Sequence, residues 1–168
     1  MSNGDPDAVT DPLSRAQDAF RHEGFGQPTF EDGIDTTDDW RTQLTKGCKL
    51  IEVTNTLQEQ NGYYIAMIEL SFAVIERSLE AYLLAMTGDD LNDFQDHTYV
   101  YQRADESGLF TADTAEELRD LYESNRTDSY YAGQHPTGEQ AVAMIDLARG
   151  VHEYVDNVIR GESACNCS

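Results

Sequence analysis

The chain has 168 residues, of which 39% are hydrophobic, and its 32 acidic and 11 basic residues give a formal net charge of -21. This length suits one domain with a substantial core, and the charge disfavours a basic groove for nucleic acid, a polybasic membrane patch and the steering of anionic substrates at low salt. Because the acidic residues are spread over the whole chain, as in proteins of halophiles, and because molar salt shortens the Debye length to about 3 Å, the charge does not exclude an RNA partner.

Residues 1–35 are expected to form a flexible N-terminal extension that contains one short helix. The first seven residues have neither the basic region nor the apolar run of a secretory signal, which favours a cytoplasmic protein. The helix is expected over residues 11–22, with Thr10 as its N-cap, Pro12 in its first turn and Gly24 beyond its end. Its apolar face would consist of Leu13, Ala16 and Phe20.

Two long helices joined by a tight turn are expected next. The first begins near Thr36 or Thr37 and stops at Asn61 and Gly62, which are strong helix breakers. The second covers residues 63–86 and is expected to be the central helix, because its apolar residues recur at steps of three and four. The short connection makes the two helices antiparallel neighbours. Their apolar faces would be Trp40, Leu44, Cys48 and Ile51 on the first helix and Tyr64, Ile68, Ser71, Ile75, Leu79, Tyr82 and Met86 on the second.

The charged residues of the central helix are expected to form a narrow strip that faces solvent: Glu69, Glu76, Arg77 and Glu80. Four charges also argue against a membrane span. Glu76 and Glu80 lie one turn apart, but a di-metal carboxylate site would need Glu-x-x-His on partner helices, which the sequence lacks. We therefore expect neither a metal nor a cofactor.

Three more helices are expected downstream. One covers residues 98–107, one runs from residue 111 or 113 to at least residue 126, and one covers residues 137–161. The last opens on Thr-Gly-Glu-Gln, which fits a capping box, and residues 127–136 before it are expected to form a turn. The apolar face of the last helix is Ala141, Met144, Ile145, Ala148, Val151, Val155, Val158 and Ile159.

No segment alternates apolar and polar residues with a period of two, so no sheet is expected. The sequence predicts an all-α fold, an antiparallel four- to five-helix bundle over residues 36–161, with the short N-terminal helix before it and a disordered tail over residues 162–168. In this tail, Cys165 and Cys167 form a C-x-C pair that could supply two ligands of a metal or redox site, which is half of a site. Cys48 is expected to be a small buried residue.

The sequence has no Gly-rich phosphate loop, no paired-cysteine zinc motif and no H-x-x-x-H helix. A candidate binding site lies instead around Arg126, at the expected end of a helix, where a guanidinium could hold a phosphate or a carboxylate bidentately. The alternative is an ion pair that ties the helix end to an acidic neighbour such as Asp128. His22 and His152 are expected at the surface or at a rim. The candidate site residues are Asn125, Arg126, Tyr130, Tyr131, His97 and Arg103, with His135 after them.

Three stretches of the sequence resemble the HEPN family of helical bundles, which is associated with nucleotidyltransferases and RNase toxins. They are GYYIAMIELSFAVIERSLEAYLLAMTG, DHTYVYQRADESGLFTADTAEELRDLYESNR and TDSYYAGQHPTGEQAVAMIDLARGVHEYV, which lie within residues 37–159. The resemblance implies a HEPN-like bundle that forms a homodimer and has nucleotide, RNA or a nucleotidyltransferase as its partner.

Active members of that family carry Arg, a polar residue and then His after four to six intervening residues, and they cut RNA without metal at a dimer cleft. Arg126 matches the Arg of this motif and Thr127 matches the polar residue. Tyr130 and Tyr131 occupy the window of the His, and His135 follows Arg126 only after eight residues. The resemblance therefore implies a non-catalytic bundle that binds its partner at a cleft around Arg126.

Two alternatives stay open. The first is a metal-independent endoribonuclease of the toxin or defence type, with Arg126 as phosphate clamp and His135 or His97 as the group that transfers the proton. The second is a structural adaptor in which Arg126 is part of an internal ion pair.

Overall fold

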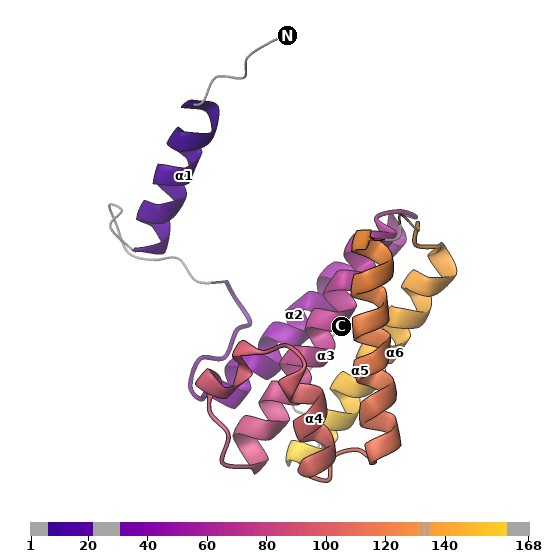
Figure 1. Ribbon diagram of the computed structural model, residues 1–168. Coiled ribbons are helices and arrows are strands. Elements are labelled where there is room, and N and C mark those ends of the chain that lie inside the picture. Colours follow the sequence, from indigo (N-terminus) through magenta and orange to yellow (C-terminus); the bar gives the residue numbers. More distant parts are fainter. Residues whose placement is uncertain (1–6, 22–30, 132, 134, 161–168) are drawn as a thin grey trace. The chain divides into compact units, whose positions relative to one another are not determined.

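The computed structural model describes residues 7–21, 31–131, 133 and 135–160, with side chains omitted at positions 7, 127–131 and 160. The described residues form six α-helices and one 3-10 helix and contain no strand, which confirms the predicted all-α helical bundle (Figure 1). The chain divides into two compact units, Met1–Asp32 and Gly33–Ser168. None of the described helices is both long and apolar enough to cross a membrane.

The first unit contains one described helix, α1 (Asp7–Phe20). It begins four residues earlier than predicted, so that Thr10 and Pro12 lie inside the helix and Thr10 is not its N-cap. The described side chains of α1 are all exposed, Phe20 at 88%, and the predicted apolar face is not buried. His22 and Gly24 lie outside the described residues.

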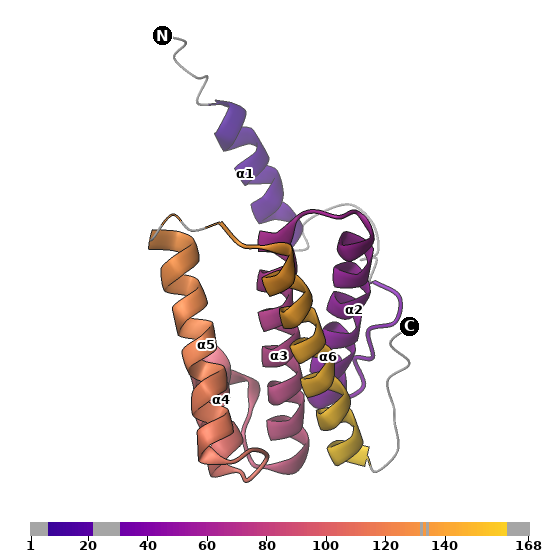
Figure 2. The ribbon, with the colours of Figure 1, turned by 90° about the vertical axis from the view of Figure 1, so that its right-hand side faces the viewer.

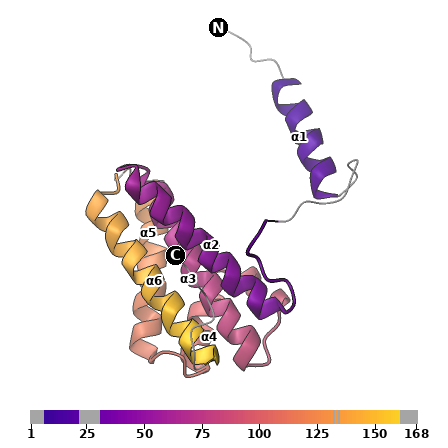
Figure 3. The same cartoon turned by 180° about the vertical axis from the view of Figure 1, so that it is seen from behind.

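The second unit is built on the helical hairpin of α2 (Asp39–Glu59) and α3 (Tyr64–Met86), as predicted. The chain reverses between them through Asn61 and Tyr63, whose φ angles of 52° and 62° are in the left-handed region. Asn tolerates this region, whereas Tyr is strained there. α2 and α3 then lie side by side along their length (Figure 3).

The helix α3 is the central element of the bundle, because it packs on both α2 and α6 (Gly138–Arg160) and also contacts α4 (Tyr99–Glu106) (Figure 2). The capping box predicted for α6 is present. The backbone N–H of Gln140 donates to Thr137 Oγ1 at 3.2 Å, and the N–H of Thr137 donates to Gln140 Oε1 at 2.9 Å. The core includes Leu44 and Ile51 of α2, Met67, Ile75, Leu79 and Leu83 of α3, and Ile145, Ala148 and Val155 of α6.

A second pair of helices, α4 and α5 (Ala112–Tyr131), packs on one side of α3. The 3-10 helix η1 (Leu91–Gln95) leads into α4, and a capping box between Asp90 and Asp93 fixes its start. The helix α5 makes its closest approach to α4 and stands further from α3 and α6 (Figure 2). Side chains of α3, α5 and α6 enclose a pocket between α5 and the other two helices, α3 and α6.

The structure corrects the prediction that residues 127–136 form a turn. The helix α5 continues through Tyr131, and the chain turns only at Gly133, whose φ of +63° favours glycine. No helix breaker precedes Gly133 in this segment, so the helical hydrogen bonds continue past the predicted end. Arg126 therefore lies inside a helix and not at its end.

The structure also buries polar residues that were expected to face solvent. The residues Glu76 and Glu80 are only 6% and 3% exposed, so they are not part of a solvent-facing strip. His152 is 1% exposed and lies between α3 and α2, because its Nδ1 hydrogen-bonds Ser78 Oγ at 2.9 Å and its ring lies against Gly47. Burial lowers the pKa of His152, although Asp156 and Glu153 act to raise it.

Cys48 is buried, as expected, but it is disulfide-bonded. The other two cysteines of the chain, Cys165 and Cys167, lie outside the described residues.

Candidate functional site

Two helix faces and one loop residue meet in a pocket with a volume of about 230 Å³ on the side of α3 that faces α5. Glu69, Phe72, Ala73 and Glu76 recur on α3 at steps of three, one and three residues, which places them on one face of that helix. Tyr122, Asn125 and Arg126 share a face of α5 in the same way, and His97 enters from the loop before α4. We call this cavity the charged pocket.

The imidazole of His97 is held by a carboxylate in the charged pocket. Its Nδ1 lies 2.9 Å from Oε2 of Glu76, whose side chain is 8% exposed, whereas the side chain of His97 is 59% exposed. In the neutral imidazole, Nδ1–H donates to the carboxylate and Nε2 then carries the lone pair. Glu76 therefore orients a ring whose outer part is accessible from solvent.

The guanidinium of Arg126 is held by the neighbouring aromatic ring. Its NH1 donates to the hydroxyl of Tyr122 at 3.0 Å, and its Cζ lies 5.7 Å from the centroid of the same ring. Burial and the Glu76 carboxylate raise the pKa of Tyr122, while the hydrogen bond from Arg126 acts to lower it. The Tyr122 ring also packs edge-on against Phe72 at 5.5 Å. Arg126 is thus positioned by a ring that is itself part of the core.

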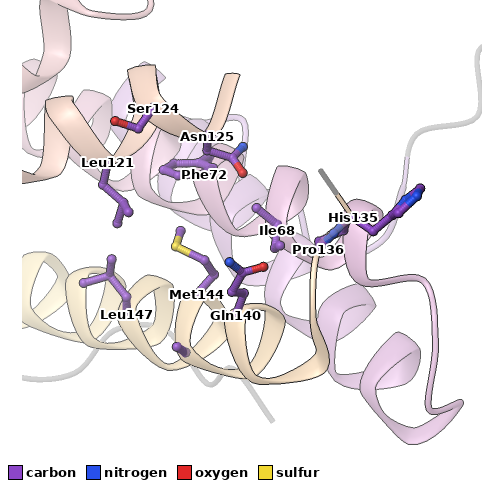
Figure 4. Close-up of a pocket in the computed structure, with 11 residues that line it drawn as sticks. Ile68, Phe72, Leu121, Ser124, Asn125, His135, Pro136, Gln140, Met144 and Leu147 are labelled. Carbon is purple, nitrogen blue, oxygen red and sulfur yellow. The ribbon is translucent and has the colours of Figure 1, made fainter. Parts of the chain in front are cut away.

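A second, larger pocket of about 350 Å³ lies between α5 and α6, with α3 behind it (Figure 4). Leu121 of α5 and Leu147 of α6 point toward one another across it (Figure 4). We call this cavity the apolar pocket, since most of its wall is hydrocarbon. Its lining residues are Ile68, Phe72, Leu121, Ser124, Asn125, His135, Pro136, Gln140, Ala143, Met144 and Leu147.

The charged pocket and the apolar pocket share two lining residues, Phe72 and Asn125. These two residues therefore stand between the cavities. One cavity presents a hydrocarbon wall and the other an oriented imidazole and guanidinium, and both kinds of surface are usual in small-molecule sites.

The structure brings together three of the candidate residues predicted from the sequence, which are Asn125, Arg126 and His97. His135 is not among the residues that line the charged pocket. It is exposed and lies beside Pro136 at one end of the apolar pocket, with its ring directed away from Asn125 (Figure 4). The side chains of Tyr130 and Tyr131 lie outside the described residues.

Arg103 has a structural partner away from the charged pocket. Its guanidinium donates to Asp89 from Nε and NH2, the latter at 2.9 Å, and to Glu106 from NH1 at 3.0 Å. Partial burial acts to raise the pKa of Asp89, but the hydrogen bonds from Arg103 and Thr87 hold it below its ordinary value. Arg103 therefore ties α4 to the loop that follows α3.

Two groups that complete the site were not predicted from the sequence: Glu76 as the partner of His97, and the apolar wall around Phe72 and Gln140. One signal was available, since Asn125 and Arg126 lie three and four residues after Tyr122 and so fall on its side of the helix. No pattern in the sequence links residue 97 to residue 76. Among the described residues, no group of His, Cys, Asp and Glu side chains has the arrangement of a metal site.

Comparison with known proteins adds a family but no activity. No curated protein and no solved structure matches the chain. One family model matches residues 4–167, almost the whole length, and its description is "Domain of unknown function (DUF8154)". The chain therefore belongs to the DUF8154 family, whose members share a domain of unknown function.

Proposed function

We propose that this protein is a non-catalytic, HEPN-like binding module that holds a phosphate-bearing ligand, a nucleotide or RNA, in the charged pocket. The main support is that Arg126, Asn125 and His97, three residues singled out from the sequence, line one cavity. Guanidinium groups bind phosphate oxygens through charge-assisted hydrogen bonds. The cytoplasmic location, the homodimer and a nucleotidyltransferase partner are proposals that rest on the sequence and on the resemblance alone.

The two carboxylates in the charged pocket set a condition for this binding. Glu76 is paired with His97, and Glu69 is a second acidic residue in the lining. With a formal net charge of -21 on the chain, long-range repulsion opposes an incoming phosphate at low salt. Molar salt removes most of that repulsion and leaves the short-range contacts. We therefore expect binding to strengthen as salt is raised, which is the reverse of ordinary nucleic-acid binding.

The test is a titration of the protein with AMP and with a 5′-phosphorylated oligoribonucleotide in about 2 M KCl. Arg126→Ala is expected to weaken binding about tenfold or more, because it removes the charge-assisted contact to the phosphate. Arg119→Ala is the matched control, since Arg119 lies on the same helix and lines neither pocket. Equal affinities of the wild type and Arg126→Ala would refute the proposal.

A second candidate function is a metal-independent endoribonuclease, and the hydrogen bond between His97 and Glu76 specifically favours it. A carboxylate that orients an imidazole is the usual arrangement of a general base, and Arg126 lines the same pocket. The oligoribonucleotide samples from the titration, kept with EDTA and run on a gel, separate the two functions. Intact RNA supports the binding module. RNA fragments that form with the wild type but not with His97→Ala or Arg126→Ala would make the protein a ribonuclease, with His97 and not His135 as the group that transfers the proton.

A further inference from the structure

We propose that the apolar pocket receives the base of a nucleotide whose phosphate lies in the charged pocket. This inference rests on the proposed function, and it adds the recognition of the base and the residues that perform it. The apolar pocket has a volume of about 350 Å³ and is lined by three helices, α3, α5 and α6. Cavities of this size with a mostly hydrocarbon wall and a few polar side chains are typical sites for small molecules.

The wall of the apolar pocket suits a flat ring system. Ile68 and Phe72 form its floor on α3, Met144 and Leu147 lie on α6, and Leu121 faces them from α5 (Figure 4). Leu121 is 42% exposed although it lies on the inner side of its helix, because α5 stands away from α6 at this point. A base placed between these side chains would remove their hydrocarbon surface from water, which is favourable at about 25 cal/mol per Å².

Three polar side chains lie at the rim of this wall, where the edge of a base could reach them. They are Ser124 and Asn125 from α5 and Gln140 from α6 (Figure 4). Gln140 is fixed by the capping box, in which its Oε1 accepts from the backbone N–H of Thr137, so its amide nitrogen is held in one place as a donor. Side-chain amides pair with the edges of bases, most specifically with that of adenine.

The position of Asn125 and Phe72 links the two ends of the proposed ligand. Both residues line the apolar pocket and the charged pocket, so the base and the phosphate of one ligand would lie on either side of them. Arg126 and His97 line the charged pocket and do not line the apolar pocket. A ligand must therefore have a flat, apolar body with polar edges joined to an anionic group, and a nucleoside monophosphate has this form.

The experiment uses three probes that divide the ligand into parts: AMP, adenosine, which lacks the phosphate, and ribose 5-phosphate, which lacks the base. Ala143→Phe fills the apolar pocket from α6, where Ala143 is an exposed lining residue. Val142→Phe is the matched control, because Val142 is its exposed neighbour and does not line the pocket. Ser124→Leu closes the pocket from the opposite wall and replaces Ala143→Phe if that variant does not fold.

We expect Ala143→Phe to weaken the binding of AMP and adenosine about tenfold or more and to leave ribose 5-phosphate unchanged, while Val142→Phe changes none of the three. Equal affinity of AMP and ribose 5-phosphate, with no effect of Ala143→Phe or Ser124→Leu, would overturn the base pocket and leave the phosphate site intact. Adenosine binding that Ala143→Phe abolishes, with no binding of ribose 5-phosphate, would support the base pocket and refute the phosphate site. If none of the three probes binds, both proposals fail.

Discussion

Glu80 is a carboxylate held inside the bundle by an ion pair with the preceding turn of its own helix. Its Oε1 lies 2.8 Å from NH2 of Arg77, while Oε2 is buried with no hydrogen-bond partner among the described residues. Burial raises the pKa of Glu80 from 4.5 to about 7, with Arg77 and Lys46 opposing that rise and Glu76 adding to it. The folded protein therefore binds a proton at this carboxyl at a pH where the unfolded chain has released it.

This raised pKa predicts that Glu80 makes the fold less stable as pH increases. Because the folded pKa lies above the unfolded value, the stabilisation is complete below the unfolded pKa and is lost as pH rises through about 7. A rise from 4.5 to about 7 corresponds to about 3 kcal/mol. Between about pH 5 and about pH 8, the free energy of unfolding of the wild type should fall by about 2–3 kcal/mol more than that of Glu80→Gln. Urea titrations at both pH values measure this difference.

The exposed Glu117→Gln serves as the control for that comparison, because it removes the same charge from the surface of α5. Its stability should follow the wild-type pH profile. The contribution of His152, whose lowered pKa acts in the opposite direction, is present in all three proteins and cancels. Parallel profiles for Glu80→Gln and the wild type would show that Glu80 is ionised throughout this range in the folded protein.

At the scale of the elements, the packing of α2 against α3 and α6 includes a contact at one glycine. A Cβ on Gly47 would lie 3.2 Å from Nδ1 of His152 and 3.5 Å from Oγ of Ser78, both of which are buried. The three residues come from α2, α6 and α3, so this small polar contact lies where the three long helices meet. Neither side chain can move away from a new methyl group without breaking the hydrogen bond between them.

We predict opposite effects for alanine at two helical glycines. Gly150→Ala on α6, where nothing lies within 4 Å of the added Cβ, should stabilise the protein by about 0.5–1 kcal/mol through helix propensity. Gly47→Ala gains the same propensity but crowds His152, and it should destabilise the protein by about 1 kcal/mol or more. Thermal unfolding followed by far-ultraviolet circular dichroism compares the two variants. An increase in stability for both variants would mean that the helices separate easily at this point.

At the scale of the whole molecule, the net charge of -21 affects the stability of the fold without depending on any particular contact. Self-repulsion between acidic side chains opposes a compact fold, and it is screened by salt. The melting temperature should therefore rise by at least about 5 °C between about 0.1 M and about 2 M KCl, the shift expected for a gain of about 2 kcal/mol in a chain of this size.

Most of that rise should occur below about 1 M, where the Debye length has already fallen to about 3 Å. Sorbitol at equal osmolality is the control, because it is uncharged and does not screen. A melting temperature that is the same at both salt concentrations, or that sorbitol raises equally, would show that repulsion between surface charges does not limit the stability.

The sequence by itself determined the helices α2 to α6, because the apolar residues of each one recur at the helical period. It placed the start of α1 four residues late and did not predict η1. The hairpin of α2 and α3 follows from the short Asn61 and Gly62 connection, and the capping box at Thr137 follows from four adjacent residues. The helix α5 extends beyond its predicted end, because no glycine or proline lies between Arg126 and Tyr131 to break it.

Only the tertiary structure decided which helix faces meet, since sequence periodicity places a residue on a face but says nothing about what that face contacts. It buried Glu76, Glu80 and His152, which sequence reasoning left at the surface, and it joined Glu76 to His97 across 21 positions of the chain. It also placed Arg126 beside His97 in one pocket and His135 outside it. The physical reason is that a binding site is made by side chains from separate helices, and their distances depend on how the whole bundle packs.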